Sequence, residues 1–80
     1  MFTVYVLYSA AYDKIYIGMT SDLEGRLLSH NELGVKGWTV RYRPWRLLYQ
    51  EEYEDKSSAL QREKSLKSYR GRMFIRSLIQ

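Results

Sequence analysis

The chain has 80 residues, with 13 Lys or Arg against 9 Asp or Glu, a formal net charge of +4 and no cysteine. A chain of this length is expected to build one domain over residues 1–80. Without cysteine there are no disulfides and no thiolate metal site, so oxygen ligands or the single His30 remain for any cation. No stretch approaches the roughly 20 apolar residues that span a bilayer, and we expect a cytoplasmic protein that binds no membrane.

Two β-rich segments open the chain. Residues 2–9 and 14–19 are rich in β-branched and aromatic side chains, and a short polar link containing Asp13 separates them. This pattern predicts two strands in a hairpin. Because side chains alternate along a strand, Tyr5 and Tyr16 are expected to share one surface of the sheet.

The next predicted element is a helix from Asp22 to Asn31. Ser21 and Glu24 have the spacing of a capping box, in which each side chain accepts a hydrogen bond from the backbone of the other. Gly34 is expected to end the helix in the left-handed conformation. The apolar stripe of this helix consists of Leu23, Leu27 and Leu28.

The second half of the chain is predicted to contain one strand and two helices. Residues 35–44 hold Trp38 and Tyr42 beside glycine and proline, which indicates an ordered connection over the core. Residues 45–53 form the third strand. A second helix, capped by Asp55, carries Ala59, Leu60 and Leu66 at helical spacing, and Gly71 separates it from a last helix over residues 73–79. The order is strand, strand, helix, strand, helix, helix, which is an α/β domain.

Three polar residues of the predicted helices carry two interpretations each. Arg26 and His30 are four residues apart and therefore lie on one helix face, where a lone histidine is more often structural than functional. Glu63 lies at the edge of the apolar stripe of the second helix. A carboxylate there needs a cation, which is Arg26, a metal or another basic residue, so an ion pair and a metal site both remain open.

Positive charge is concentrated in the C-terminal half. Residues 1–40 hold three basic and four acidic side chains, whereas residues 41–80 hold ten basic and five acidic ones. Residues 62–76 alone contain six Lys or Arg against the single acid Glu63. Such a field attracts a phosphate backbone, although a solvated helix face is the plainer interpretation of a basic cluster.

Taken together, these residues resemble the GIY-YIG nuclease superfamily. The resemblance rests on Tyr5 within Thr3-Val4-Tyr5, on Tyr16-Ile17-Gly18 after ten intervening residues, and on the three helical residues Arg26, His30 and Glu63. The resemblance covers nearly the whole chain. The chain is similar to small stand-alone members of the superfamily and to the N-terminal catalytic domain of excision-repair incision subunits. The resemblance implies a small three-stranded antiparallel sheet flanked by helices. Softer matches are Thr20-Ser21-Asp22-Leu23-Glu24, His30-Asn31, Arg43-Pro44-Trp45, and the run from Ala59 through Glu63 to Lys67.

The resemblance also implies roles at the site. Glu63 corresponds to the glutamate that holds Mg²⁺ or Mn²⁺, and Arg26 to the arginine that contacts the scissile phosphate. Tyr5 and Tyr16 correspond to tyrosines that activate water or support it, and His30 to a position of proton transfer. A tyrosine has an ordinary pKa of about 10, so at pH 7 only about one in a thousand is phenolate. We expect Arg26 and the metal to lower the pKa of the site tyrosines. DNA contacts are assigned to Lys64, Lys67, Arg70 and Arg72.

The function implied is a metal-dependent endonuclease that hydrolyses DNA with low sequence specificity or a preference for a DNA structure. Two departures from the family pattern bear on this. Thr3 and Val4 replace the Gly-Ile of the first motif, which is harmless in a strand, and no asparagine follows Glu63. The second departure favours a DNA-binding module of the same fold with weak or no catalysis. A further alternative is a protein-binding domain that uses exposed Trp38 and Tyr42.

Overall fold

Three antiparallel strands form the centre of the computed structural model, which describes residues 1–34 and 37–79. They are β1 (Phe2–Ser9), β2 (Lys14–Thr20) and β3 (Arg46–Tyr53), arranged in the order β2-β1-β3. In this register Tyr5 of the central strand lies opposite Gly18 of β2. The small three-stranded antiparallel sheet implied by the resemblance is therefore confirmed.

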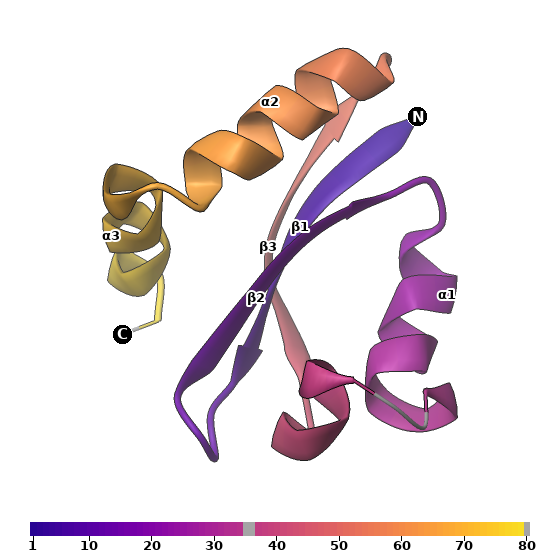
Figure 1. Cartoon of the computed structure of the whole chain (residues 1–80), viewed down its shortest axis with the longest axis vertical. Coiled ribbons are helices and arrows are strands. Elements are labelled where there is room, and N and C mark those ends of the chain that lie inside the picture. Colours follow the sequence, from indigo (N-terminus) through magenta and orange to yellow (C-terminus); the bar gives the residue numbers. More distant parts are fainter. Residues whose placement is uncertain (35–36, 80) are drawn as a thin grey trace.

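Helices cover both faces of this sheet (Figure 1). On one side lies α1 (Leu23–Leu28), which continues into a π-helix, η1 (Ser29–Leu33). On the other side lie α2 (Lys56–Leu66) and α3 (Tyr69–Ser77). The order of strands and α-helices is as predicted. Among the described residues, no helix has the length and apolar character needed to cross a bilayer.

A 3₁₀-helix, η2 (Trp38–Tyr42), occupies part of the predicted connection over the core. Val35 and Lys36, which belong to the same connection, lie outside the described residues. Trp38 is exposed, as predicted, whereas Tyr42 is half-buried because it packs against a core cluster beneath it.

The central strand is buried on both faces, from Thr3 to Ser9. Alternate side chains enter two separate cores. Val4 and Val6 pack with residues of α2 and α3, whereas Tyr5 and Leu7 pack with Trp45 and the α1 side. Burial on both faces fixes the orientation of β1, so the strand that carries Tyr5 is held rigidly between two helical layers.

The start and end of the first helix differ from the prediction. Asp22, and not Ser21, caps α1, because its side chain accepts from the backbone N–H of Gly25 at 3.1 Å. The α-helical part ends at Leu28, where the wider π-helical turn begins. Gly34 is extended, with φ −70°, so the predicted left-handed stop is wrong.

The last two helices are separated differently from the prediction. Asp55 caps α2 as expected, but α2 ends at Leu66 and Ser68 caps α3, which contains Gly71 in its first turn. A Cβ atom at Gly71 would lie 2.4 Å from the Cα of Leu66. The glycine therefore permits a close approach of α3 to the end of α2, and does not break the helix.

Two leucines assigned to apolar stripes are exposed. Leu28 is 46% exposed and Leu60 is 45% exposed, because each lies at the solvent side of its helix. The buried contacts of these helices come instead from Leu23 and Leu27 on α1 and from Ala59 and Leu66 on α2. A short helix packed on one layer needs only a narrow apolar face.

Candidate active site

The centre of the candidate site is a hydrogen bond between Tyr5 and His30. The Tyr5 hydroxyl oxygen lies 3.1 Å from His30 Nε2, and the two residues are 1% and 5% exposed. Tyr16 completes the group, with its ring centroid 6.1 Å from that of Tyr5 and 4.7 Å from that of His30. The predicted shared surface of the two tyrosines is present, and the histidine lies beside both.

Gly18 makes room for the Tyr5 side chain. A Cβ atom at this position would lie 2.6 Å from the Tyr5 hydroxyl oxygen and 2.8 Å from Cζ of the same ring. Such contacts are far below van der Waals separation, so any side chain here would displace the ring. The glycine of Tyr16-Ile17-Gly18 is thus explained by the path of the opposite tyrosine, and not by a turn.

A hydroxyl fixes the far side of the His30 ring. Thr39 Oγ1 lies 3.1 Å from His30 Nδ1, and the Thr39 carbonyl accepts a hydrogen bond from Trp45 Nε1 at 2.7 Å. Both ring nitrogens of His30 therefore have partners. A histidine held at both nitrogens keeps one orientation, and here that orientation faces Tyr5.

Two side chains hold the backbone around His30, one from the segment before β3 and one from η1 itself. Arg43 donates to the carbonyls of Ser29, His30 and Gly34. The Asn31 side chain accepts from the backbone N–H of Trp45 at 2.6 Å and donates to its carbonyl at 2.9 Å. These bonds satisfy backbone groups that the end of a helix leaves without partners. They also attach η1 to the start of β3.

Arg26 lies at the surface between two hollows. One hollow is polar and runs toward the start of α2, and it is lined by Phe2, Met19, Thr20, Ser21, Arg26 and Lys56. The other lies over the tyrosine and histidine group and is lined by Tyr16, Arg26, Ser29, His30, Gly34, Gly37, Trp38 and Thr39. The guanidinium is therefore accessible to an anion that enters either hollow.

Burial shifts the acid–base properties of both central residues. Burial raises the pKa of Tyr5 above its ordinary 10.0, and the nearby Arg26 guanidinium lowers it by less. Arg26 thus acts on the Tyr5 pKa in the expected direction, but its effect is smaller than that of burial and the pKa is raised. Burial, followed by Arg26 and Arg43, lowers the pKa of His30 below 6.5. At neutral pH both side chains are uncharged.

Glu63 is carried by the helical layer on the other side of the sheet. Its helix, α2, packs on the face of β1 opposite Tyr5. The Glu63 side chain is 19% exposed, and its Oε2 pairs with Lys67 Nζ at 2.9 Å. Of the cations considered from the sequence, the partner found is thus another basic residue and not Arg26. In the described part of the chain, no three His, Asp or Glu side chains gather where they would share a metal ion.

The basic cluster of residues 62–76 is partly neutralised by acids from elsewhere in the fold. Arg62 pairs with Glu51 at 3.0 Å, Lys67 with Glu63, and Arg76 with Asp13 of the β1–β2 turn. The sequence placed only Glu63 near this cluster, because Glu51 and Asp13 are distant along the chain. Lys64, Arg70 and Arg72 form no salt bridge among residues 1–34 and 37–79.

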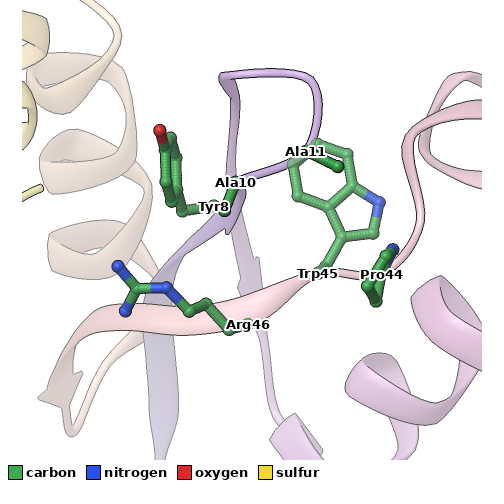
Figure 2. Close-up of a pocket in the computed structure, with 6 residues that line it drawn as sticks. All are labelled: Tyr8, Ala10, Ala11, Pro44, Trp45 and Arg46. Carbon is green, nitrogen blue, oxygen red and sulfur yellow. The ribbon is translucent and has the colours of Figure 1, made fainter.

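A further hollow lies apart from the predicted site residues. It is formed where the β1–β2 turn meets the start of β3, with Tyr8, Ala10, Ala11, Pro44, Trp45 and Arg46 around it (Figure 2). The Arg46 guanidinium carbon lies 5.4 Å from the Tyr8 ring centroid. None of its lining residues is a sequence-predicted site residue, and we assign it to packing around Trp45.

Several supporting residues carried no chemical signal in the sequence. Thr39 and Arg43 act on His30 across a segment without periodicity, so no spacing rule finds them. The runs His30-Asn31 and Arg43-Pro44-Trp45, which contribute to the family resemblance, contain two of the residues that hold the η1 backbone. The resemblance thus indicated the correct segments without indicating what their side chains do.

The chain and its fold match a known class of domain. A family model described as the GIY-YIG catalytic domain matches residues 1–74, and the chain belongs to this family. Membership in this nuclease family supports a nuclease-type function.

Relatives and a solved structure agree with that assignment. A UPF0213 protein of Staphylococcus aureus strain Mu3 is 46% identical over 56 residues, which is 69% of this chain and 67% of the relative. A UPF0213 protein of Staphylococcus saprophyticus is 38% identical over 55 residues, with the same coverage. The solution NMR structure of a UPF0213 protein from Bacillus halodurans has a TM-score of 0.57 at 26% identity, and the match covers 99% of this chain and 86% of that one. The protein is thus similar to small stand-alone GIY-YIG proteins.

Proposed function

We propose that the protein is a metal-dependent endonuclease that hydrolyses DNA phosphodiester bonds with low sequence specificity or a preference for a DNA structure. One observation carries the proposal: the buried Tyr5–His30 hydrogen bond lies beside Tyr16 at a hollow that Arg26 also lines. A nucleophile-activating pair next to an accessible guanidinium is what phosphodiester hydrolysis requires. Membership in the GIY-YIG family supports the same reaction class.

The proton path follows from the hydrogen bonds of His30. In the tautomer that serves catalysis, Nδ1–H donates to Thr39 and the free electron pair of Nε2 accepts from the Tyr5 hydroxyl. As water attacks phosphorus, the water proton passes to the Tyr5 oxygen while the Tyr5 proton passes to Nε2. Tyr5 thus needs no stable phenolate, which agrees with its raised pKa, and neutral His30 is the acceptor. Tyr16 supports the water from the neighbouring strand.

Arg26 is assigned to the phosphate. Negative charge grows on the non-bridging oxygens as the attacking oxygen bonds to phosphorus, and a guanidinium can donate two hydrogen bonds to them. Its position between the two hollows supports this role, because a bound strand that crosses either hollow passes Arg26.

Glu63 is the residue that would hold Mg²⁺ or Mn²⁺. Hard cations accept a single carboxylate, with water and phosphate oxygens completing their shell, so the donor type at Glu63 fits. The hydrogen bonds of Glu63 to other described residues use only Oε2, which leaves Oε1 for a cation. When bound, the ion would supply positive charge to the phosphate and leaving oxygen of a strand that passes through the hollow between Arg26 and Lys56. In the structure Lys67 neutralises Glu63, and it would compete with the ion for this carboxylate.

DNA affinity is assigned mainly to contacts between basic side chains of α2 and α3 and the phosphate backbone of DNA. Lys64 on α2, Lys67 at its C-cap, and Arg70 and Arg72 on α3 are all exposed. Contacts of this kind neutralise phosphates without reading bases, which supports low sequence specificity.

A DNA-binding module of the same fold with weak or no catalysis is the second candidate. The observation that favours it is the absence of asparagine after Glu63, which leaves Lys67, Arg70 or Arg72 to position the metal or phosphate. Cleavage of a branched or flapped DNA in the presence of Mn²⁺ separates the two candidates.

In that assay we expect Arg26→Ala and Tyr5→Phe each to lower the cleavage rate about 100-fold or more, because charge at the phosphate or the proton path is lost. DNA binding should change little, since one contact of many is removed. Arg46→Ala is the matched control, because it removes an exposed arginine that packs on Tyr8 outside the site. Wild-type rates in both site variants would overturn the assignment.

A further inference from the structure

A second group of aromatic residues extends from the candidate active site to the surface. Trp38 is 45% exposed and Tyr12 is 52% exposed, and Tyr42 lies between them. We call Tyr12, Trp38 and Tyr42 the outer aromatic surface. It joins the β1–β2 turn to η2, two segments that are distant in the sequence.

The rings of this surface support one another. The Trp38 centroid lies 4.9 Å from Tyr42 and 5.7 Å from Trp45, and Tyr12 meets Tyr42 edge-on at 5.4 Å. Trp45 is 4% exposed and belongs to the core, so it anchors Trp38 from below. An indole with buried aromatic neighbours is held in one orientation while nearly half of it faces solvent.

The outer aromatic surface is continuous with the proposed catalytic group. The Trp38 and Tyr16 rings are inclined by only 29°, with centroids 6.5 Å apart. Trp38 lines the same hollow as Arg26 and His30. A strand whose phosphate meets Arg26 therefore brings the base of an adjacent nucleotide within reach of the indole.

Two cations frame the surface. Lys14 Nζ lies 5.5 Å from the Tyr42 ring centroid, and Arg41 Cζ lies 5.7 Å from it. Both residues are exposed, and neither forms a salt bridge within the part of the chain that the structure describes. Aromatic rings and unneutralised cations together match a ligand with flat faces and negative charge, which a nucleotide provides and an apolar protein surface does not.

We propose that the outer aromatic surface is a stacking site for an unpaired nucleobase of the strand held at Arg26. This inference rests on the proposed function and adds the substrate class to it. Within a duplex, both faces of each base are covered by its neighbours, so only a displaced, frayed or single-stranded base can stack on Trp38. The substrate is then DNA that carries unpaired nucleotides at the cut, such as a flap or a junction.

Intrinsic tryptophan fluorescence tests this site without metal or cleavage. The chain has two tryptophans, and only Trp38 is exposed. We expect an oligothymidylate to quench wild-type fluorescence, and an abasic sugar-phosphate oligomer of equal length and charge to do so much less. Trp38→Leu should weaken oligothymidylate binding, measured by anisotropy of a labelled oligomer, by about tenfold or more. Trp38→Phe should retain most of the affinity because it keeps a ring.

The controls separate stacking from folding and from catalysis. Tyr69→Leu removes an aromatic that is 78% exposed on α3 and should leave binding unchanged. Thermal unfolding of each variant verifies that the fold persists. Equal binding of the oligothymidylate and the abasic oligomer, equal affinity of Trp38→Leu and wild type, or equal quenching by a fully paired, blunt-ended duplex would each overturn the proposal. The proposal would also be overturned if DNA had no effect on Trp38 fluorescence and the fluorescence fell only because the protein associates with itself as its concentration rises. Failure of cleavage alone would overturn the proposed function and leave this result standing.

Discussion

His30 combines a structural and a chemical role in one side chain. It is buried, bonded at both nitrogens, and flanked by two arginines that disfavour its protonation. The plainer interpretation of a lone histidine, a satisfied structural residue, is thus consistent with the contacts, and so is a role as proton acceptor. The two interpretations agree that the residue is neutral in the folded protein at neutral pH, and this has a measurable consequence.

We predict that the free energy of unfolding decreases as the pH falls below about 6.5. The pKa of His30 is lowered in the folded protein, so on acidification the unfolded chain takes up its proton first. Stability is therefore complete above the unfolded pKa of 6.5 and is lost as the pH falls toward the folded value. Each unit of pKa difference corresponds to about 1.4 kcal/mol. Urea unfolding between pH 7.5 and 5.5 measures the effect.

Between pH 7.5 and 5.5 the change in stability reports on His30, because it is the single histidine of the chain. The carboxyl groups whose pKa the structure shifts, Asp13, Glu51 and Asp55, are all shifted downward and titrate at lower pH. His30→Gln should remove the pH dependence in this window, whatever it does to stability itself. A wild-type protein with constant stability across the window would contradict the burial of a neutral imidazole.

At the scale of elements, strands and caps were predictable where local chemistry decides them. The β1 boundaries and the Asp55 cap agree with the sequence pattern, because alternation and capping are local properties. The π-helical turn after α1 was not predictable. Its backbone is held by Arg43 and by the Asn31 contact to Trp45, which are interactions between distant segments. The same reason applies to the site. The sequence motifs predict Tyr5, Tyr16, Arg26 and His30, whereas the contact of Thr39 with His30 is known only from the folded structure.

Glu63 on α2 offers a second prediction, because its ion pair is local to one helix. A Glu–Lys pair at i,i+4 with partial exposure is worth about 0.3–0.5 kcal/mol, so Glu63→Gln should lower the melting temperature of the apo protein only slightly. Mn²⁺ should raise the melting temperature of wild type but not of the variant. At a hundredfold excess over Kd the gain is about 2.7 kcal/mol. Thermal unfolding with and without Mn²⁺ provides both values.

Lys67→Met is the control for this experiment. It removes the cation that competes for the Glu63 carboxylate, so the Mn²⁺ shift should persist or increase. An equal Mn²⁺ shift in wild type and Glu63→Gln would place the metal elsewhere. A Glu63→Gln protein that unfolds many degrees lower without metal would mean that the carboxylate has a structural role larger than its pair with Lys67.

For the molecule as a whole, the basic residues of α2 and α3 and the tyrosine and histidine group lie on different sides of the sheet. The tyrosine and histidine group faces α1, whereas Lys64, Arg70 and Arg72 are carried by α2 and α3 (Figure 1). A DNA that contacts both must pass around an edge of the sheet. The polar hollow between Arg26 and Lys56 connects the end of β2 to the start of α2 and provides such a path. A branched or bendable DNA meets this requirement more readily than a straight duplex.

The salt dependence of DNA binding tests which charges make contact. Each phosphate contact releases condensed counterions, so the logarithm of the affinity falls linearly with the logarithm of salt concentration, by about 0.7–0.9 per contact. Lys64 and Arg70 form no salt bridge among the described residues, whereas Arg62 and Arg76 are already paired with Glu51 and Asp13. We therefore expect Lys64→Gln with Arg70→Gln to reduce the slope by about 1.4–1.8. Arg62→Gln with Arg76→Gln should reduce it less, in protein that thermal unfolding shows to be folded. If the paired arginines lower the slope as much as Lys64 and Arg70 do, their ion pairs do not keep them from contacting DNA. If binding ignores salt altogether, the basic surface of α2 and α3 is not where DNA binds.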